Sequence, residues 1–355
     1  MSAASQQPRC IGPRLKNMPE LPENTAVSIH PAKKLQQVLG YADPIFNASM
    51  AGAAGGALAA AVSAAGGFGM LGIGGNTTKE WIDGEAGIAA SSGRPWGAGL
   101  MAWVLDKNLD PLEQVLEHGP SFVCISFGEP GPAAALVHES GALTGMQVGN
   151  AAELSRALED DIDVVICRGN EGGGHGRNEV STLPLLQLAL EKTNKPVIAA
   201  GGLATAAGVA AVLGAGASAA WIGTRFAAAT ESMSHRNIKD AIGAAGIDDT
   251  IYTRAFDIAQ RIDWPVEYGG RALRNDFSDN WAEDLEALGA TVDASDALTD
   301  SINEARAKAD LSLAPVYAGQ SAGLSVAGQS AAEIVADLAR FRSVLQQAAQ
   351  RWESA

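Results

Sequence analysis

The sequence predicts a parallel (β/α)8 barrel, or TIM barrel, and three observations support this fold class. Short apolar runs alternate with helical patterns about eight times between residues 44 and 223. Several runs are continuously apolar, as expected of parallel strands that are buried on both faces. Glycine and polar residues gather directly after the runs, at the strand ends where barrels place their functional loops.

Eight apolar runs are the candidate barrel strands. A doubly wound sheet also alternates strands with helices, but it concentrates its unusual residues at one switch point. Here such residues follow six of the runs, which favours the closed barrel. The candidate strands are Pro44–Ser49, Gly69–Ile73, Trp96–Trp103, Phe122–Phe127, Ala142–Val148, Asp163–Cys167, Pro196–Ala200 and Ala219–Gly223.

Helix start and stop signals lie between these runs. The Ala-rich segment Gly55–Ala65 ends at a Gly-Gly pair, which is a typical C-terminal stop. Polar residues that commonly cap helices precede the other helical patterns. The expected caps are Asp110 before Pro111–Glu117, Asn150 before Ala151–Leu158, Thr182 or Ser181 before Leu185–Leu190, and Thr205 before Ala206–Leu213.

The strand and helix rhythm breaks after about Thr230, and this divides the chain into four segments. Residues 1–40 are expected to form a loosely held N-terminal extension that packs on the second subunit of a homodimer. Residues 41–230 are expected to form the barrel, and residues 231–312 are expected to form a mostly helical insertion over its mouth. Residues 313–355 return to the barrel as a loop and a C-terminal helix, Ser330–Gln350, whose apolar residues follow helical spacing.

The overall composition excludes several classes of partner. The formal net charge is −15 and the pI is about 4.7, which disfavours nucleic acid and anionic membranes as partners. No apolar run approaches the length of a membrane span. Cys10, Cys124 and Cys167 are odd in number and widely spaced, which predicts neither a disulfide framework nor a metal site. A cytoplasmic protein without a metal is therefore expected.

Two glycine turns near the end of the strand series predict a phosphate site. The segments Pro196–Gly202 and Ala219–Arg225 are each a buried strand that ends in small residues. Glycine allows backbone N–H groups to approach an anion, and the loops after strands seven and eight commonly bind phosphate in such barrels. The candidate phosphate-binding turns are therefore Gly201-Gly202 and Gly223–Arg225.

A glycine-rich loop carries the candidate catalytic residue, His175. The loop, Arg168–Arg177, follows a predicted strand and contains three consecutive glycines, so it can approach a flat ligand closely. Histidine transfers protons near neutral pH, and this one lies at the functional end of a strand. The other four histidines have no such context and are interpreted as surface or packing residues: His30, His118, His138 and His235.

The end of the first strand offers a third candidate region, formed by Ala48, Ser49 and Met50. Its backbone groups and its methionine suit the edge of an isoalloxazine ring. The glycine series Gly66–Gly74 contains no well-placed G-x-G-x-x-G that opens a helix. A dinucleotide site of the NAD type is therefore disfavoured.

Together these motifs resemble the nitronate monooxygenase family. Gly169–His175 resembles the family's segment around its catalytic histidine, and Ala199–Gly202 and Ile222–Phe226 resemble its FMN phosphate turns. The resemblance implies an FMN-dependent oxidoreductase that oxidises alkyl nitronates with O2 to a carbonyl compound and nitrite. It also implies that His175 is the base for neutral nitroalkanes and that Gly173, Gly202 and Trp221–Thr224 contact FMN.

Three positions around the expected flavin site differ from the family pattern. Members usually have Gln-Ala-Pro-Met where this chain has Asn47–Met50, so Ser49 replaces a proline. They often have asparagine where Gly99 stands. They usually have glutamine at the position of Arg168, which either stabilises a reduced, anionic flavin or points into a surface ion pair.

Three alternatives remain open at this stage. The first is an FMN-dependent NAD(P)H reductase on the same barrel, acting on an enoyl-acyl-carrier protein or a quinone. The second is a phosphate-binding isomerase or aldolase. Such an enzyme requires a lysine at a strand end or a pair of acidic residues, and the sequence shows no strand-end lysine. The third is a binding protein without catalytic activity.

Overall fold

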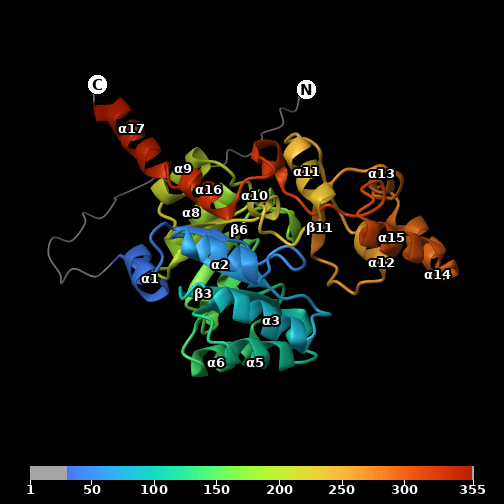
Figure 1. Ribbon diagram of the computed structural model, residues 1–355, viewed down its shortest axis with the longest axis horizontal. Helices are drawn as coiled ribbons and strands as arrows, with labels where there is room; N and C mark the ends of the chain where they lie inside the picture. The colour runs from blue at the N-terminus through green and yellow to red at the C-terminus, as the bar shows by residue number, and fades with distance from the viewer. Residues whose placement is uncertain (1–29, 354–355) are drawn as a thin grey trace, which may run out of the picture. The chain divides into compact units, whose positions relative to one another are not determined.

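Eight parallel strands form the core of the structure, a computed structural model that describes residues 30–353 (Figure 1). Their spatial order is β1-β9-β8-β6-β5-β4-β3-β2, and every neighbouring pair is parallel. All eight predicted strands are present, which confirms the predicted barrel. Their bounds are β1 Ile45–Asn47, β2 Gly69–Gly72, β3 Trp96–Met101, β4 Phe122–Ser126, β5 Leu143–Val148, β6 Val164–Arg168, β8 Val197–Ala200 and β9 Ala219–Ile222.

The two ends of this sheet meet between β1 and β2. Phe46 and Phe68 form a parallel bridge, and the amide of Phe68 donates a hydrogen bond of 2.9 Å to the carbonyl of Ile45. The rings of Phe46, Phe68 and Phe122 fill the interior at centroid distances of 4.7 and 6.3 Å. The interior is therefore a packed core, as in other barrels of this class.

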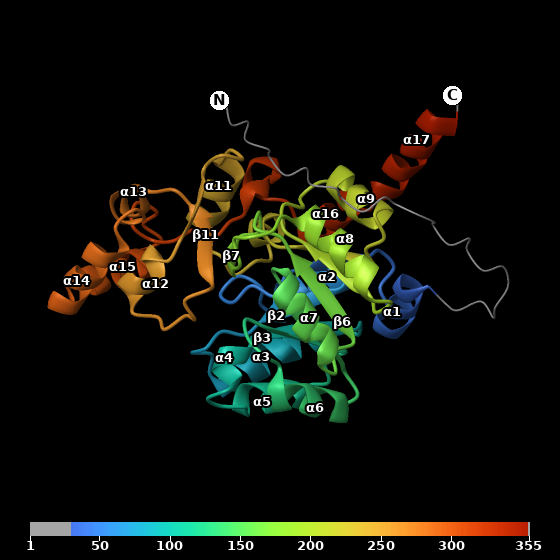
Figure 2. The same cartoon turned by 180° about the vertical axis from the view of Figure 1, so that it is seen from behind.

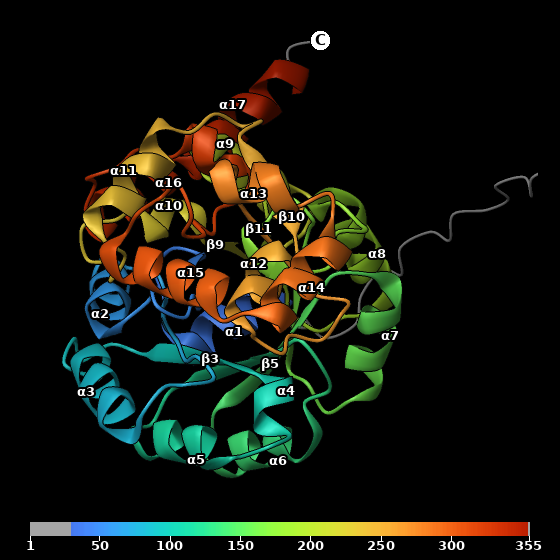
Figure 3. The ribbon, with the colours of Figure 1, turned by 90° about the vertical axis from the view of Figure 1, so that its right-hand side faces the viewer.

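Helices surround the strands, as Figure 3 shows for α2, α3, α5, α6, α7 and α8. Large apolar clusters between strands and helices bury residues such as Leu58, Val62 and Ile82 almost completely. The barrel helices are α1 Pro31–Leu39, α2 Gly56–Ala64, α3 Lys79–Ala90, α4 Ala102–Leu105, α5 Asp110–Glu117, α6 Gly131–Glu139, α7 Ala151–Glu159, α8 Thr182–Lys192, α9 Ala206–Gly214 and α10 Thr224–Ala227.

The predicted helix caps are mostly correct. Asn150 accepts a hydrogen bond from the amide of Glu153, and Thr205 accepts one from the amide of Gly208. Asp110, however, is the first residue of α5 and not its cap. The backbone amide of Asp110 donates a hydrogen bond of 2.9 Å to Oδ1 of Asn108, so this amide is paired with a side chain two residues earlier.

The segment after β9 contains helices and also two strands that the sequence did not predict. The strands β10 Thr250–Thr253 and β11 Gly269–Leu273 pair antiparallel, and β11 pairs in turn with β7 Gly174–Gly176. Figure 2 shows β7 beside β11. The glycine loop after β6 is therefore part of the inserted sheet. The helices here are α11 Arg236–Ala244, α12 Ala255–Gln260, α13 Asp276–Trp281, α14 Leu285–Ala294 and α15 Ala297–Lys308.

The chain then returns to the barrel. A 3-10 helix, η1 Gln320–Leu324, precedes α16 Ala331–Leu338 and α17 Phe341–Glu353, so two helices stand where one was predicted. A capping box at Ser330 and Glu333 begins α16. No helix within residues 30–353 is long and apolar enough to span a membrane. Most of the predicted N-terminal extension lies outside the described residues, whereas α1 packs Leu35 and Leu39 into the barrel interior.

Candidate functional site

Arg168 holds the glycine loop that carries His175. Its guanidinium donates hydrogen bonds of 2.6 to 3.2 Å to four loop carbonyls, those of Gly172, Gly173, Gly174 and Arg177. The residue is 4% exposed, and burial lowers the pKa of its guanidinium to about 10. Of the two orientations considered from the sequence, the surface ion pair is wrong. The positive charge stays buried beneath the loop.

His175 lies opposite Gly270 in the pairing of β7 with β11. Its Nε2 atom is 2.8 Å from Oδ1 of Asp257, a carboxylate on α12 that is 1% exposed. The indole of Trp264 stacks on the imidazole at a centroid distance of 3.8 Å and an interplanar angle of 6°. The imidazole is therefore held at one edge and covered on one face.

Aromatic side chains from separate parts of the chain surround this imidazole. Trp264 contacts the rings of Trp103 and Phe127 at 5.2 and 5.1 Å, and Tyr317 lies 5.2 Å from the imidazole. Phe127 directly follows β4 and has a φ of +66°, which is costly for a bulky residue. The backbone therefore stores strain where the barrel strands end, as functional sites often do.

The predicted phosphate turns lie beside the glycine loop. Gly202 has a φ of +70°, and a Cβ there would lie 3.3 Å from Glu171 Cβ. The hydroxyl of Thr224 accepts a hydrogen bond of 2.9 Å from the amide of Gly319, and a Cβ on Gly173 would lie 2.4 Å from that same amide nitrogen. The loop and both turns therefore meet at one place, with Gly319 between them.

The residues after β1 lie against the same region. The Sδ atom of Met50 and the Cβ of Ala48 are 3.6 and 3.7 Å from the position of a Cβ on Gly223. A Cβ on Gly99 would lie 2.0 Å from Oγ of Ser49, so the serine occupies the space that glycine leaves. The two departures from the family pattern, at residues 49 and 99, therefore depend on each other.

Two of the predicted cofactor residues have their side chains in the protein core. Trp221 is 4% exposed in the barrel interior, and its indole N–H donates 2.7 Å to the carbonyl of Asn47. The side chain of Ile222 packs on the helix side of the sheet, while its carbonyl accepts from the amide of Ala48. These two residues shape the turn at Gly223 from within the sheet.

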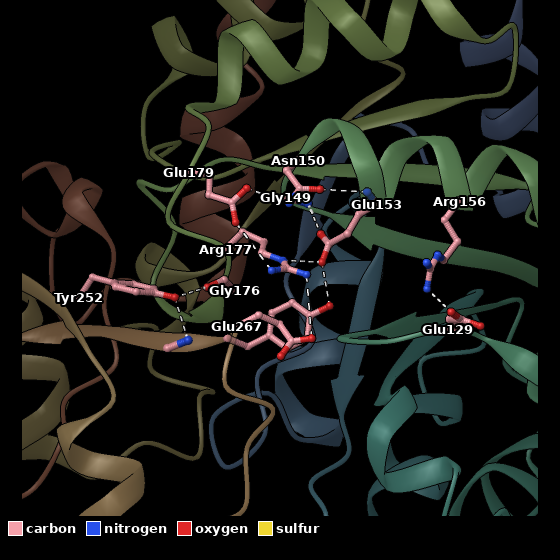
Figure 4. Close-up of polar contacts among 12 residues, drawn as sticks. Glu129, Gly149, Asn150, Glu153, Arg156, Gly176, Arg177, Glu179, Tyr252 and Glu267 are labelled. Atoms are coloured by element: carbon pink, nitrogen blue, oxygen red, sulfur yellow. Dashed lines mark hydrogen bonds and ion pairs between the residues drawn. The ribbon is translucent and has the colours of Figure 1, made fainter. Parts of the chain in front are cut away.

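A polar network ties the glycine loop to the insertion (Figure 4). Arg177 lies between Glu153, Glu179 and Glu267, and its Nε donates 2.7 Å to Glu153. The hydroxyl of Tyr268 donates to the same oxygen at 2.7 Å. Tyr252 donates to the carbonyl of Gly176. The segment that carries Trp264 is thereby fixed to the loop that carries His175.

The sequence did not identify Asp257, Trp264 or Tyr317 as site residues. They lie in the inserted segment and the returning loop, where no strand periodicity marks their position.

Three other histidines lie in the structural contexts proposed for them, as surface or packing residues. His118 and His138 pair with Asp83 and Asp163, and His235 caps α11.

The fold and the site together define a parallel β/α barrel with a histidine at its mouth. Similarity to known enzymes identifies it as an oxidoreductase. The chain belongs to the nitronate monooxygenase family, whose sequence model matches residues 32–340. This membership confirms the resemblance deduced from the motifs and supports a flavin as the cofactor.

Two relatives are similar to this chain: one is a nitronate monooxygenase and the other is a dehydrogenase. A nitronate monooxygenase of Paraburkholderia phytofirmans is 30% identical over 87% of this chain and 94% of its own. A (3aS,4S,5R,7aS)-5-hydroxy-7a-methyl-1-oxo-octahydro-1H-indene-4-carboxyl-CoA dehydrogenase of Mycobacterium tuberculosis is also 30% identical, over 63% of each chain.

Two solved structures are similar to this chain over most of its length. FabK from Thermotoga maritima superposes with a TM-score of 0.78 and 29% identity, over 90% of this chain and 98% of its own. A nitroalkane oxidase from Streptomyces ansochromogenes superposes with a TM-score of 0.73 and 28% identity, over 88% and 99%.

Proposed function

We propose that this protein is an FMN-dependent nitronate monooxygenase that is located in the cytoplasm and acts as a homodimer. In balance, two nitronate anions and one O2 give two carbonyl compounds and two nitrite ions. Bound FMN would supply the electron transfer between nitronate and O2, while the protein positions both reactants. The family membership and the similarity to a nitroalkane oxidase support this reaction class.

The geometry of the turns fits the phosphate of FMN. Gly201 and Gly202 have φ values of +102° and +70°, and within the described part of the chain no acceptor pairs with their amides. Such amides can donate to phosphate oxygens without a Cβ in the way. We assign the phosphate to Gly202, Gly223 and Thr224, and contacts with the ring to Ala48, Ser49, Met50 and Gly173.

Arg168 would act on the cofactor through its charge. Its hydrogen bonds are made to loop carbonyls, so we propose no direct ion pair with the flavin. A buried guanidinium beneath the loop stabilises negative charge that develops above it, because the low dielectric screens it little. It would therefore favour the reduced, anionic form of the ring.

His175 would accept a proton from the carbon beside the nitro group of a neutral nitroalkane. The C–H bond breaks, its electron pair forms the C=N bond of the nitronate, and the imidazole becomes an imidazolium. The observation that carries this role is the position of the imidazole on the loop that also meets both phosphate turns. A preformed nitronate has already lost this proton and would not need the base.

The first test is the absorbance spectrum of the purified protein, followed by identification of the released flavin and a nitronate assay that detects nitrite. We expect a flavin spectrum, release of FMN and formation of nitrite in air. A colourless protein that takes up no added FMN would instead support the binding protein without catalytic activity.

The NAD(P)H reductase remains the second candidate function, because a relative that is 30% identical over 63% of this chain is named a dehydrogenase rather than a monooxygenase. Anaerobic mixing with NADH or NADPH separates the two functions. Rapid bleaching of the flavin supports a reductase, whereas slow or absent bleaching together with nitrite formation supports the monooxygenase.

A further inference from the structure

The carboxylate of Asp257 is almost completely buried, and its contacts are few. It is 1% exposed, and the second oxygen, Oδ2, has no hydrogen-bond partner among the described residues. A buried carboxylate is costly unless a donor compensates it. Its side-chain partner is Nε2 of His175 at 2.8 Å. A proton on Nε2 lets the imidazole donate to this carboxylate and so compensate its burial.

This contact fixes which nitrogen of the imidazole is available for chemistry. A neutral imidazole has one N–H and one acceptor nitrogen, and the hydrogen bond to one determines the state of the other. With Nε2–H donating to Asp257, the lone pair lies on Nδ1. No described residue forms a hydrogen bond with Nδ1, and the parallel indole of Trp264 limits rotation of the ring.

We propose that Asp257 is a positioning residue that holds His175 in its Nε2–H tautomer and leaves Nδ1 as the atom that accepts the substrate proton. This inference rests on the proposed function of His175 as a base. Asp257 lies on α12, 82 residues after the histidine. The insertion would then supply the residue that orients the catalytic base, in addition to covering the barrel mouth.

The proposal gives the insertion a specific role in the chemistry. When His175 takes the proton from carbon, the new imidazolium lies 2.8 Å from a negative charge inside the protein. That charge stabilises the imidazolium, and therefore the transition state that leads to it. A nitronate substrate forms no imidazolium and gains nothing from Asp257.

Asp257→Asn tests this role, with Asp257→Glu as the charge-conserving variant. We expect Asp257→Asn to lower kcat on a neutral nitroalkane about a hundredfold, which is the lower range for loss of assisted proton transfer. Turnover of the preformed nitronate should change less than about threefold. Asp257→Glu should recover part of the lost nitroalkane activity, which a purely structural residue would not predict.

Asp163→Asn is the matched control, because Asp163 also binds a histidine. Its Oδ2 is 2.9 Å from Nε2 of His138, but it directly precedes β6 and so lies at the opposite end of the barrel. This variant should keep the wild-type ratio of nitroalkane to nitronate turnover. A similar change of that ratio in both variants would overturn the proposal.

Nuclear magnetic resonance of protein labelled with 15N-histidine gives a readout that needs no turnover. We expect the His175 resonances of the wild-type protein to show a protonated Nε2 and an unprotonated Nδ1, and Asp257→Asn to lose this preference. A wild-type Nδ1–H tautomer, or equal losses on both substrates, would overturn the proposal. The predicted tautomer in a protein that oxidises neither substrate would instead refute the proposed function alone.

Discussion

The indole of Trp264 lies parallel to the imidazole of His175, with 3.8 Å between the ring centroids. The two residues come from different segments, so the stack fixes the insertion against the glycine loop. Aromatic pairs contribute about 0.5–1.5 kcal/mol beyond their buried area, which corresponds to a factor of about two to ten in rate.

Trp264→Ala should therefore lower kcat/KM on a neutral nitroalkane about two- to tenfold, because the imidazole is no longer held in one orientation. Trp264→Phe should retain most of the activity, since a ring remains. Trp352→Ala is the control, because Trp352 is 84% exposed on α17. Wild-type kinetics for Trp264→Ala would contradict a role for the stack.

Gly202→Val should raise the dissociation constant of FMN at least about tenfold. The residue has a φ of +70°, and a side chain there would crowd the turn assigned to the phosphate. The matched control is Gly141→Val, which has a similar φ of +85° and lies in the turn before β5, with no atom within 4 Å of its Cβ position. Fluorescence titration of the apoprotein measures both constants. Equal effects of the two substitutions would refute this placement of the phosphate.

Cys124 and Cys167 should resist alkylation in the folded protein. Burial raises the pKa of each thiol to about 12, although a hydrogen bond with Ser126 partly opposes this for Cys124. At pH 8 the reactive thiolate is then on the order of a thousandfold scarcer than in a free cysteine. Peptide mass spectrometry after iodoacetamide treatment tests this, with urea-unfolded protein as the reference. Rapid labelling of either residue without urea would show that its burial is wrong.

The protein should lose stability as the pH rises above 10, and Tyr317 should contribute to this loss. Burial raises the pKa of the Tyr317 hydroxyl above its ordinary value of 10, and the Asp257 carboxylate raises it further. Above pH 10 the unfolded chain releases the phenolic proton while the folded chain keeps it, so stability falls by about 1.4 kcal/mol per pH unit for each such group.

Tyr317→Phe removes this contribution. Its free energy of unfolding should therefore fall less steeply than that of the wild type between pH 10 and pH 11. Urea denaturation at a series of pH values measures both slopes. Identical slopes would mean that the hydroxyl titrates normally in the folded protein.

The barrel could be predicted from sequence because its strands are buried on both faces and read as continuous apolar runs. The strands β10 and β11 could not, since they carry Tyr252 and Arg271 and show no comparable run. Their existence depends on pairing with β7, a contact between segments that are distant in sequence. Such contacts leave no local pattern.

The candidate site also contains residues that could be predicted from the sequence and residues that could not. His175 and the glycine turns follow strands directly, so their positions could be deduced from the strand order. Asp257 is an ordinary acidic residue in the first turn of a short helix, and only the fold brings it to His175. The mutual dependence of Ser49 and Gly99 is also visible only in space, because their separation of 50 positions hides the contact.

The most direct test of the account compares His175→Asn with the wild type on a neutral nitroalkane and on its preformed nitronate, with nitrite as the product measured in both assays. Removal of the base should abolish turnover of the nitroalkane and leave considerable activity on the nitronate, because only the first substrate must lose a proton. Equal loss on both substrates would contradict the assignment of His175 as the base.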